Sequence, residues 1–446
     1  MLKNKYQEIL VGMGPVSLVR GIISLKRKKS TLLIDDKRFF VSNYPGLFIS
    51  ELEILALMRL GKKYDIPELI DIRQFIGPAK INLVTEEIRL KIGQGPLQNI
   101  KEILRKYPEL LDESDLDEVY AENEDEFTQY FLKELERFEA QNFEASLRPK
   151  GHRFLLSGPG WLKTFFQRFG ELLNQEYAVS KSLKFSALLH LLGIIHEEKL
   201  RTNLGKEELP FYFFRTLSPL YRLQDFFLVS QLKRRLSLLG GDSKVSTIQF
   251  WQFYENKFEN LLLESFEGVI SAERVLFFSH LPMEMPFRIN SPFGPLRKTE
   301  LSTTRRNLAP FPPGSITFLA DTHLLGSENP YRTISSGNQF IQYHWPYPEM
   351  HGSKPEFYEE DLRAQFDDDS KFLPFDPGLV EVNHCGGVTL DLRQLKSDQK
   401  NEAPVLSRLE MDIVHEERPV KGFEYWGPHR YQSHGLLSLL YGIEGI

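Results

Sequence analysis

Three small residues near the amino terminus have the spacing of a phosphate-binding turn. Gly12, Gly14 and Ser17 follow a short apolar run and precede an apolar pattern with helical spacing. The first glycine permits a tight turn, the second lets the backbone approach a pyrophosphate, and a small third residue lets helix and strand pack closely. The helix would direct free N–H groups and a partial positive charge at the phosphates. This pattern predicts dinucleotide binding by Gly12, Gly14, Pro15, Val16 and Ser17.

A carboxylate follows at the distance expected for a ribose contact. The second apolar run ends in Asp35 and Asp36, and Asp35 lies 23 residues after Gly12. An acid at the end of the second strand accepts hydrogen bonds from ribose hydroxyls and disfavours a 2′-phosphate. We therefore predict a strand, turn, helix and strand that hold a dinucleotide, with Asp35 and Asp36 as candidate ribose contacts. The alternative is a structural βαβ unit without a ligand.

The rest of the chain alternates between helical and β-rich stretches. Apolar residues recur with helical spacing in several segments, and Gly240-Gly241 ends the last of them. The expected helices cover 52–60, much of 96–147, 161–173, 183–200 and 226–239. The expected strands cover 245–253, 261–266, 268–279, 315–320 and 339–345, and Gly77-Pro78 predicts a turn.

Composition limits the class of protein. The chain has 446 residues with 41% hydrophobic and 26% charged residues, which are ordinary values for a globular protein. Its formal net charge of −6 argues against a general nucleic-acid binder. No apolar stretch is long enough for a membrane span, and the single cysteine, Cys385, forms no intrachain disulfide, so we expect a cytoplasmic protein. Aromatic residues, 12% of the chain, fit either an apolar ligand tunnel or a Phe-rich core.

Other combinations of reactive residues carry weaker signals. His384-Cys385 could provide a nucleophile, although glycine pairs beside cysteine are common in turns. The acidic run at 367–369 and the histidines His344, His429 and His434 lack a complete ligand set for a metal. The acidic run at 112–118 fits a solvated helix face better than a partner site. We expect no metal site and assign no catalytic side chain.

The glycine turn resembles the amino-terminal FAD signature of the amine oxidase and phytoene desaturase superfamily, whose fold Rab GDP-dissociation inhibitors share. The segment 228–279 resembles that family's helix, glycine pair, β-meander and returning strand. The segment 422–438 is similar to its last strand, glycine turn and closing helix. The resemblance implies FAD as cofactor. It adds four cofactor contacts near the carboxyl terminus, namely Gly427, Pro428, Gly435 and Leu436, with Tyr425, Trp426 and His429 beside the flavin.

The chain departs from this family pattern in several places. Ser17 replaces the third glycine, as in the Rab inhibitors, and Pro428 replaces an acid that commonly contacts the flavin side. Asn43-Tyr-Pro-Gly46 stands where a glycine pair and a basic residue usually follow the ribose acid. Tyr221-Arg222-Leu223 replaces another glycine pair, and Ser218-Pro-Leu-Tyr221 looks like the corresponding segment of the Rab inhibitors.

These features together predict an α/β fold: a Rossmann-like FAD-binding domain, with a parallel sheet and a β-meander, interwoven with a mixed helical and β substrate domain. We expect the first domain to comprise 1–75, 225–285 and 375–446, and the second 76–224 and 286–374. The resemblance implies an oxidoreductase that transfers hydride from an apolar or amine-bearing small molecule to FAD. The alternative is a non-enzymatic relative that binds a lipidated or other protein partner; a third use, an NAD-only site, also stays open.

Overall fold

The structure is a computed structural model of the 446-residue chain. It describes residues 4–36, 49–84, 89–144, 158–174, 209–223, 225–266, 268–278, 288–290, 293–305, 315–319, 332–336, 339–344, 380–385, 389–395, 412–415 and 418–426.

The amino-terminal segment forms the predicted βαβ unit. Strand β1 (Lys5–Val11), helix α1 (Pro15–Lys26) and strand β2 (Thr31–Asp35) follow one another, and the two strands pair in parallel. Proline suits the first turn of a helix because its fixed φ is helical and no hydrogen bond is lost there. The apolar residues at the end of β1 and throughout α1 are buried on both sides, which is why this unit forms the centre of the domain.

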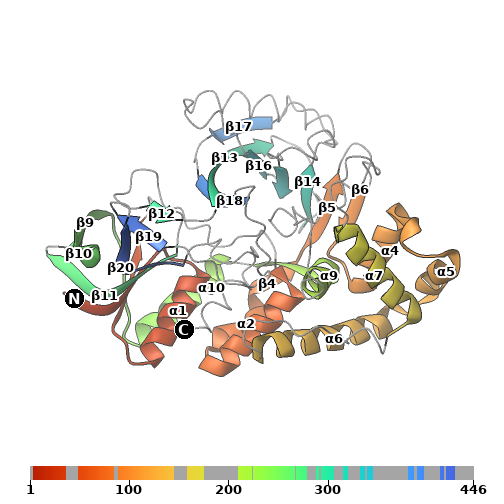
Figure 1. The fold of residues 1–446 in the computed structure, drawn as a ribbon, viewed down its shortest axis with the longest axis horizontal. Coiled ribbons are helices and arrows are strands. Elements are labelled where there is room, and N and C mark those ends of the chain that lie inside the picture. Colours follow the sequence, from red (N-terminus) through yellow and green to blue (C-terminus); the bar gives the residue numbers. More distant parts are fainter. Residues whose placement is uncertain are drawn as a thin grey trace.

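Five parallel strands make up the core of the first sheet, in the order β20-β11-β1-β2-β8. Their partners beyond the βαβ unit are β8 (Asp242–Val245), β11 (Val269–Phe277) and β20 (Arg418–Tyr425). Strands β9 (Ile248–Tyr254) and β10 (Lys257–Leu263) run antiparallel before β11 as a β-meander. Strands β12 (Arg288–Asn290) and β19 (Asp412–His415) extend the sheet at its β20 side. The predicted α/β fold with a parallel sheet and meander is confirmed (Figure 1).

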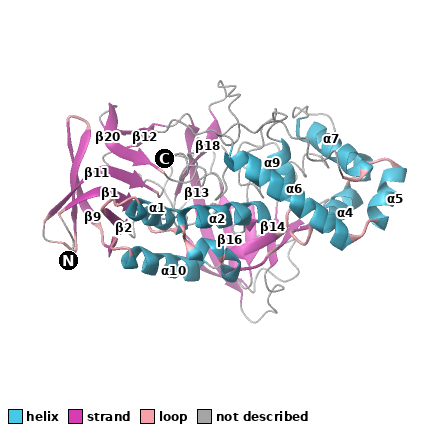
Figure 2. Ribbon diagram, turned by 90° about the horizontal axis from the view of Figure 1, so that it is seen from below, coloured by secondary structure: helices cyan, strands magenta, loops and turns pink. Residues whose placement is uncertain are grey.

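Helices cover one face of this sheet and the meander covers the other. Helices α1 and α10 (Asp225–Leu238) pack side by side, with α2 (Glu51–Tyr64) next to them (Figure 2). The short helix α3 (Pro67–Ile70) contacts both α2 and α10. Alternate residues of β1 and β2 divide between the two layers: Leu10 and Leu33 pack with the helices, and Ile9 and Leu32 pack with the meander. This alternation is the two-residue period of a strand buried on both faces.

A second sheet lies beside the first domain. Its strands are β5 (Lys80–Val84), β6 (Arg89–Ile92), β13 (Phe293–Arg305), β14 (Ser315–Leu319), β15 (Arg332–Ser336), β16 (Gln339–His344), β17 (Val380–Cys385) and β18 (Thr389–Leu395). Both β17 and β18 therefore pair outside the first sheet although they fall within the expected range 375–446. Conversely, β12 joins the first sheet although it falls within 286–374. The chain passes between the sheets more often than the expected domain boundaries allow, and those boundaries stay a prediction.

A small three-stranded sheet connects these parts. It consists of β3 (Ile49–Ser50), β4 (Ile76–Pro78) and β7 (Leu220–Leu223). The expected turn at Gly77-Pro78 is wrong, because both residues lie in β4 and pair with β7. A proline is tolerated at the edge of a sheet, and its effect on the chain was mistaken for a turn signal.

The middle of the chain forms a helical layer. It contains α4 (Pro96–Lys106), α5 (Glu113–Ala121), α6 (Glu124–Glu144), α7 (Gly160–Asn174) and α9 (Leu209–Leu217), with a single turn at Pro108–Leu110. Another single turn, Ile72–Phe75, follows α3 and contacts α2 and α10. The rings of Phe131, Phe165 and Phe213 are buried and pack on one another with centroids 6.2 to 6.4 Å apart. These three rings therefore belong to a packed aromatic core.

Gly21 sets the closeness of α1 to its neighbours. A Cβ at this position would lie 2.7 Å from Leu236 Cδ1 in α10 and 3.1 Å from Leu10 Cδ1 in β1. We expect Gly21→Val to lower the free energy of unfolding by about 1–3 kcal/mol, the usual cost of overpacking. Denaturant unfolding measures this change. Gly77→Val is the control, since a Cβ at Gly77 has no atom within 4 Å; equal losses in both variants would contradict the packing explanation.

Candidate functional site

The carboxyl ends of the parallel strands meet along one edge of the first sheet. Val11 pairs with Ile34 on one side and with Phe277 on the other, and Phe277 pairs with Tyr425. Along the chain, β2 and then β8 are added on one side of β1, whereas the later strands β11 and β20 are added on its other side, so the strand order reverses at β1. In open α/β sheets, ligands bind at the carboxyl ends of the strands beside such a reversal. The turn 12–17 follows β1 directly at this point.

The turn itself has the backbone that a phosphate site requires. Gly12 has φ of +102°, which side chains other than glycine rarely adopt, and its N–H donates to the Ile34 carbonyl at 2.9 Å. Gly14 is extended and precedes Pro15, the first residue of α1. The amides of Val16 and Ser17 belong to the first helical turn, whose N–H groups have no acceptor within the helix. The structure thus brings together all five predicted residues of this turn, and all five are buried.

Ser17 serves the turn through its hydroxyl group. Its Oγ accepts a hydrogen bond from the Gly14 N–H at 2.9 Å and donates to the Gly14 carbonyl at 3.0 Å. The side chain is 1% exposed. The residue at the third position of the motif therefore fixes the start of α1, whereas the close approach of α1 to its neighbours occurs one turn later, at Gly21.

The two predicted ribose carboxylates differ in their surroundings. Asp35 ends β2, is half-buried, and accepts a hydrogen bond from the Ser246 N–H at its main-chain oxygen. Asp36 is completely buried, and its Oδ2 accepts a hydrogen bond from the Ile248 N–H at 2.7 Å. The Asp36 carboxylate thereby ties β2 to the start of β9. Of the two, Asp35 is the one that solvent reaches, and its role at a ribose stays a prediction.

The end of β20 lies at the same edge. The Trp426 N–H donates to the Phe277 carbonyl at 2.6 Å, and the Phe278 N–H donates to the Val11 carbonyl at 2.8 Å. Tyr425 and Trp426 are each 1% exposed and pack in the cores on opposite faces of the sheet. The remaining predicted contacts, Gly427, Pro428, Gly435 and Leu436, and also His429 and His434, lie outside the described residues.

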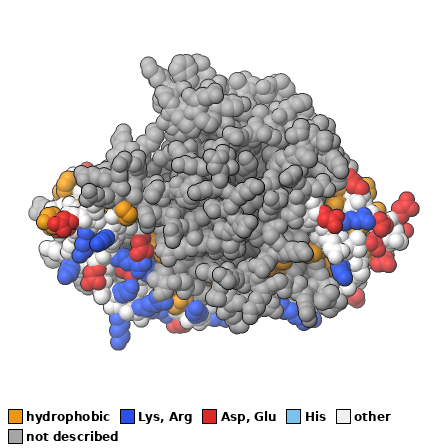
Figure 3. Space-filling model, viewed as in Figure 1, with side chains coloured by type: hydrophobic (Ala, Val, Ile, Leu, Met, Phe, Trp, Pro, Cys, Tyr) orange, Lys and Arg blue, Asp and Glu red, His pale blue; other side chains and the backbone are white. Residues whose placement is uncertain are grey.

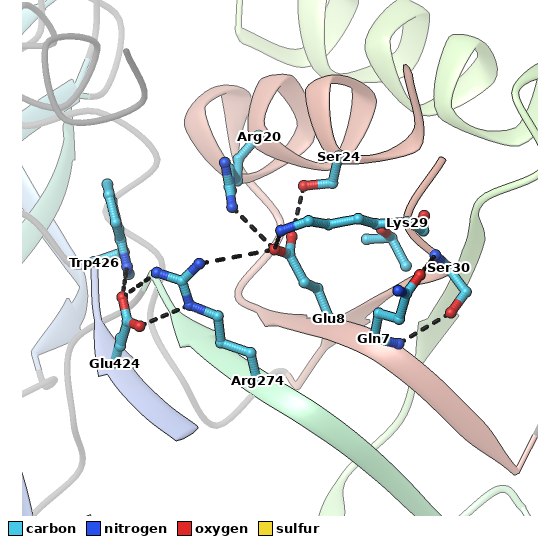
Figure 4. Close-up of polar contacts among 10 residues, drawn as sticks. Gln7, Glu8, Arg20, Ser24, Lys29, Ser30, Arg274, Glu424 and Trp426 are labelled. Carbon is cyan, nitrogen blue, oxygen red and sulfur yellow. Dashed lines mark hydrogen bonds and ion pairs between the residues drawn. The ribbon is translucent and has the colours of Figure 1, made fainter. Parts of the chain in front are cut away.

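Beneath this edge, a buried ion-pair network joins β1 to α1 (Figure 4). The Glu8 carboxylate accepts hydrogen bonds from Arg20 Nη2 at 3.0 Å, Ser24 Oγ at 2.6 Å and Lys29 Nζ at 2.7 Å. The side chains of Glu8 and Arg20 are 2% and 0% exposed. Burial by itself raises the pKa of Glu8, but the hydrogen bonds from Lys29 and Ser24 and the charges of Arg20 and Lys29 outweigh it. The pKa of Glu8 therefore lies below its ordinary value.

The network continues to the carboxyl-terminal strand of the sheet. Arg274 in β11 lies 3.9 Å from Glu8 and donates to both oxygens of Glu424 in β20, at 2.6 and 2.7 Å. Trp426 Nε1 donates to the same Glu424 carboxylate at 3.1 Å. Burial lowers the pKa of Arg274, but its hydrogen bond to Glu424 and the charges of Glu424 and Glu8 raise it above the ordinary value. Three segments far apart in the sequence are thus held by one set of charges.

The sequence contained a signal for this network that was missed. Glu8 interrupts the apolar run of β1, and Arg20 interrupts the apolar pattern of α1. A charged residue within a strand or helix that is otherwise apolar implies a buried partner, because an unpaired buried charge is very costly.

Three of the other candidate residues lie in strands of the second sheet. His384 and Cys385 lie in β17, and His344 lies in β16. The acidic run at 367–369 lies outside the described residues. No group of three or more His, Cys, Asp or Glu side chains is placed to hold a metal among the residues described. In that same part of the chain, no helix combines the length and the hydropathy needed to cross a membrane.

Comparison with protein-family models gave no match, and comparison with curated proteins gave none either. Among solved structures, the chain is similar to an oxidoreductase from Methanosarcina mazei, with 10% identity, coverage of 98% of this chain and 99% of the other, and a TM-score of 0.48. It is also similar to a geranylgeranyl bacteriochlorophyll reductase-like protein from Thermoplasma acidophilum, with 11% identity, coverage of 98% of this chain and 76% of the other, and a TM-score of 0.44. A third similar structure is p-nitrophenol 4-monooxygenase from Pseudomonas putida, with 8% identity, coverage of 99% of this chain and 78% of the other, and a TM-score of 0.44. All three TM-scores lie below 0.5, a level of similarity that assigns neither family nor activity.

Proposed function

We propose that this protein binds FAD at the edge formed by β1, β2, β11 and β20 and acts as a flavin-dependent oxidoreductase. The observation that carries the proposal is the turn 12–17. It joins a glycine with positive φ to an extended glycine and a helix start, at the reversal point of a parallel sheet. This combination presents backbone N–H groups and the positive end of a helix to a pyrophosphate.

The residues present fit the dinucleotide part of FAD. The amides of Val16 and Ser17 would hold the pyrophosphate, and Asp35 at the end of the next strand would accept hydrogen bonds from the ribose. Gly427, Pro428, Gly435 and Leu436 would contact the flavin side, as the family resemblance implies. When bound, the flavin would accept a hydride, and the protein's part would be to position the substrate and exclude water.

We propose further that the second sheet and the helical layer bind the substrate, a small molecule that is apolar or carries an amine. The support is the division of the chain: the first sheet contains the predicted dinucleotide site, and the second sheet and the helices form separate layers beside it. Assignment to the amine oxidase and phytoene desaturase superfamily stays part of this proposal and rests on the motifs at 12–18, 228–279 and 422–438. A cytoplasmic location likewise stays a prediction.

Purification of the full chain tests the cofactor directly. We expect the visible absorbance of an oxidised flavin, either as isolated or after FAD is added and the free cofactor is removed. We also expect substrate-dependent bleaching of that absorbance without oxygen, because hydride transfer reduces the ring. Folded protein that stays colourless and does not retain added FAD would exclude the proposed function.

One observation favours the non-enzymatic alternative, in which the fold binds a lipidated or other protein partner. The Ser17 hydroxyl already accepts the hydrogen bond of the Gly14 amide, so one possible phosphate donor is engaged. A serine hydroxyl can rotate to donate to a phosphate instead, and for that reason we place this alternative second. Ser17→Gly distinguishes the two: tighter FAD binding in the variant favours the alternative, and unchanged or weaker binding favours the flavoenzyme.

A further inference from the structure

Three helices end at the same corner of the first domain. Lys26, the last residue of α1, donates from Nζ to the Asp65 carbonyl at 2.7 Å and to its Oδ2 at 3.0 Å, just after α2 ends. Gly241, just after α10, packs so closely on α1 that a Cβ there would lie 2.6 Å from Leu25 Cδ1. The carboxyl-terminal ends of α1, α2 and α10 therefore lie together at the surface.

This corner carries a concentration of positive charge. We call it the basic corner and define it as Lys26–Lys29, Lys62–Lys63 and Lys233–Arg235. Figure 3 shows Lys and Arg side chains along the lower edge of the molecule, below α1 and α2 as labelled in Figure 1. The whole chain has a net charge of −6, so this excess reflects the placement of cations and not the overall composition.

Part of the positive charge has an ordinary structural role. Cations in the last turn of a helix offset the negative end of its dipole. Lys26 pairs with Asp65, Lys29 with Glu8, and Arg235 with Glu68. Asp242, which directly follows Gly241, accepts a hydrogen bond from the Tyr6 hydroxyl at 2.7 Å.

The remaining cations exceed that structural need. Among the residues described, Lys28, Lys62 and Arg234 form no ion pair, and all three are exposed. Arg27 is exposed and lies over the Tyr64 ring at 5.8 Å from its centroid. Within the described part of the chain, no acid pairs with these cations, which leaves their charges available to an external anion.

Apolar side chains project beside these cations. Leu238 ends α10 and is 74% exposed, and the next residue, Leu239, is 39% exposed. Single exposed leucines are common, but two in sequence at a helix end, next to exposed cations and a tyrosine, match the composition of bilayer-interface surfaces. There, leucines enter the headgroup layer, aromatic rings lie at its depth, and Lys and Arg reach the phosphates.

We propose that the basic corner docks on the surface of a bilayer that contains anionic phospholipids. The positive charge provides attraction to lipid phosphates and carboxylates, and Leu238 and Leu239 enter between the headgroups. Docking would hold the first domain at the membrane surface by its helix ends, so that an apolar substrate dissolved in the bilayer is concentrated near the protein. An acidic protein partner is the other occupant that these charges could take, and the vesicle experiment below distinguishes the two.

Flotation of the full chain with vesicles tests this docking. One set of vesicles contains phosphatidylcholine alone and the other contains about one third phosphatidylserine. Each Lys or Arg near an anionic surface contributes about 1 kcal/mol, roughly a fivefold gain in partitioning. We expect binding only to the anionic vesicles, and loss of that binding when salt rises from about 0.1 M to about 1 M and shortens the Debye length from about 10 to 3 Å.

Two variants separate the charge from the leucines. Lys62→Glu with Arg234→Glu should weaken binding at least about tenfold, and Leu238→Ser with Leu239→Ser should do the same through the lost apolar area. The matched control is Lys133→Glu with Lys163→Glu, since both lysines are exposed and lie on α6 and α7, outside the three helices of the basic corner. Thermal melts establish that all variants are folded.

Absent or equal binding to both kinds of vesicle overturns the proposal and would direct attention to an acidic protein partner. Unchanged binding by the charge-reversed variant overturns it as well. Vesicle binding does not require flavin, so a failure of the docking proposal can be distinguished from a failure of the proposed function.

Discussion

Gly14→Val should yield a folded protein that binds FAD roughly 100-fold more weakly than the wild type. The wild-type backbone at Gly14, with φ of −144° and ψ of 176°, lies in the extended region that β-branched residues prefer. Valine is a poorer residue than glycine before a helix, at a cost of about 1 kcal/mol. Its side chain would stand between the start of α1 and the phosphates. Loss of one or two charge-assisted hydrogen bonds, each about 1.5–3 kcal/mol, weakens binding roughly 100-fold.

A second glycine in the chain provides a matched control for this substitution. Gly95 is extended, precedes α4, and is followed by Pro96 at the first helical position, as Gly14 is followed by Pro15. A Cβ at Gly95 would have only the Glu124 Oε1 within 4 Å, at 3.6 Å. Gly95→Val should therefore retain FAD fully. Titration of each purified variant with FAD measures the difference, and retention of cofactor by Gly14→Val would exclude the turn as the pyrophosphate site.

The substitution Glu8→Val should cause the largest loss of stability in the first domain. It leaves Arg20 buried with no carboxylate, although Nε and Nη1 of Arg20 already lack hydrogen-bond partners. Removal of one member of a buried ion pair costs about 3–5 kcal/mol. Unfolding in denaturant measures the change. Asp65→Asn is the control, because the Asp65 side chain is 87% exposed in its ion pair with Lys26. Asparagine also tolerates the left-handed backbone at this position. This substitution should lower the free energy of unfolding by less than about 1 kcal/mol.

Two further measurements distinguish a buried charge from a general packing defect. The double variant Glu8→Val with Arg20→Leu should recover most of the lost stability, since an apolar pair can replace a buried ion pair without net cost.

The pH dependence of stability should also differ between the wild type and this double variant. Because the pKa of Glu8 is lower in the folded protein than its ordinary value of 4.5, Glu8 stabilises the fold above that pH. The contribution is lost as the pH falls below about 4.5 through the folded-state pKa. A double variant as acid-sensitive as the wild type would contradict this assignment.

The sequence alone determined the elements that depend on local patterns. Apolar spacing and small residues placed β1, the turn at 12–17, α1 and β2, because a strand buried on both faces, a glycine turn and a helix start each leave a signature within a few residues. The same reasoning located α10 and the meander strands, but it was off by several residues where β8 and β9 follow one another closely. It also mistook β4 for a turn, since proline and glycine interrupt a sheet edge as they do a loop.

Only the tertiary structure decided which of these elements meet. No local pattern indicates that Arg274 and Glu424 complete the charge network begun by Glu8, or that Asp36 is used to hold Ile248 while Asp35 remains half-buried. The same is true of β17 and β18, whose pairing with β13 removes them from the first sheet. Strand pairing and ion pairing join residues tens to hundreds of positions apart, so their free energy depends on the packed arrangement of the whole chain and leaves little trace in any single segment of the sequence.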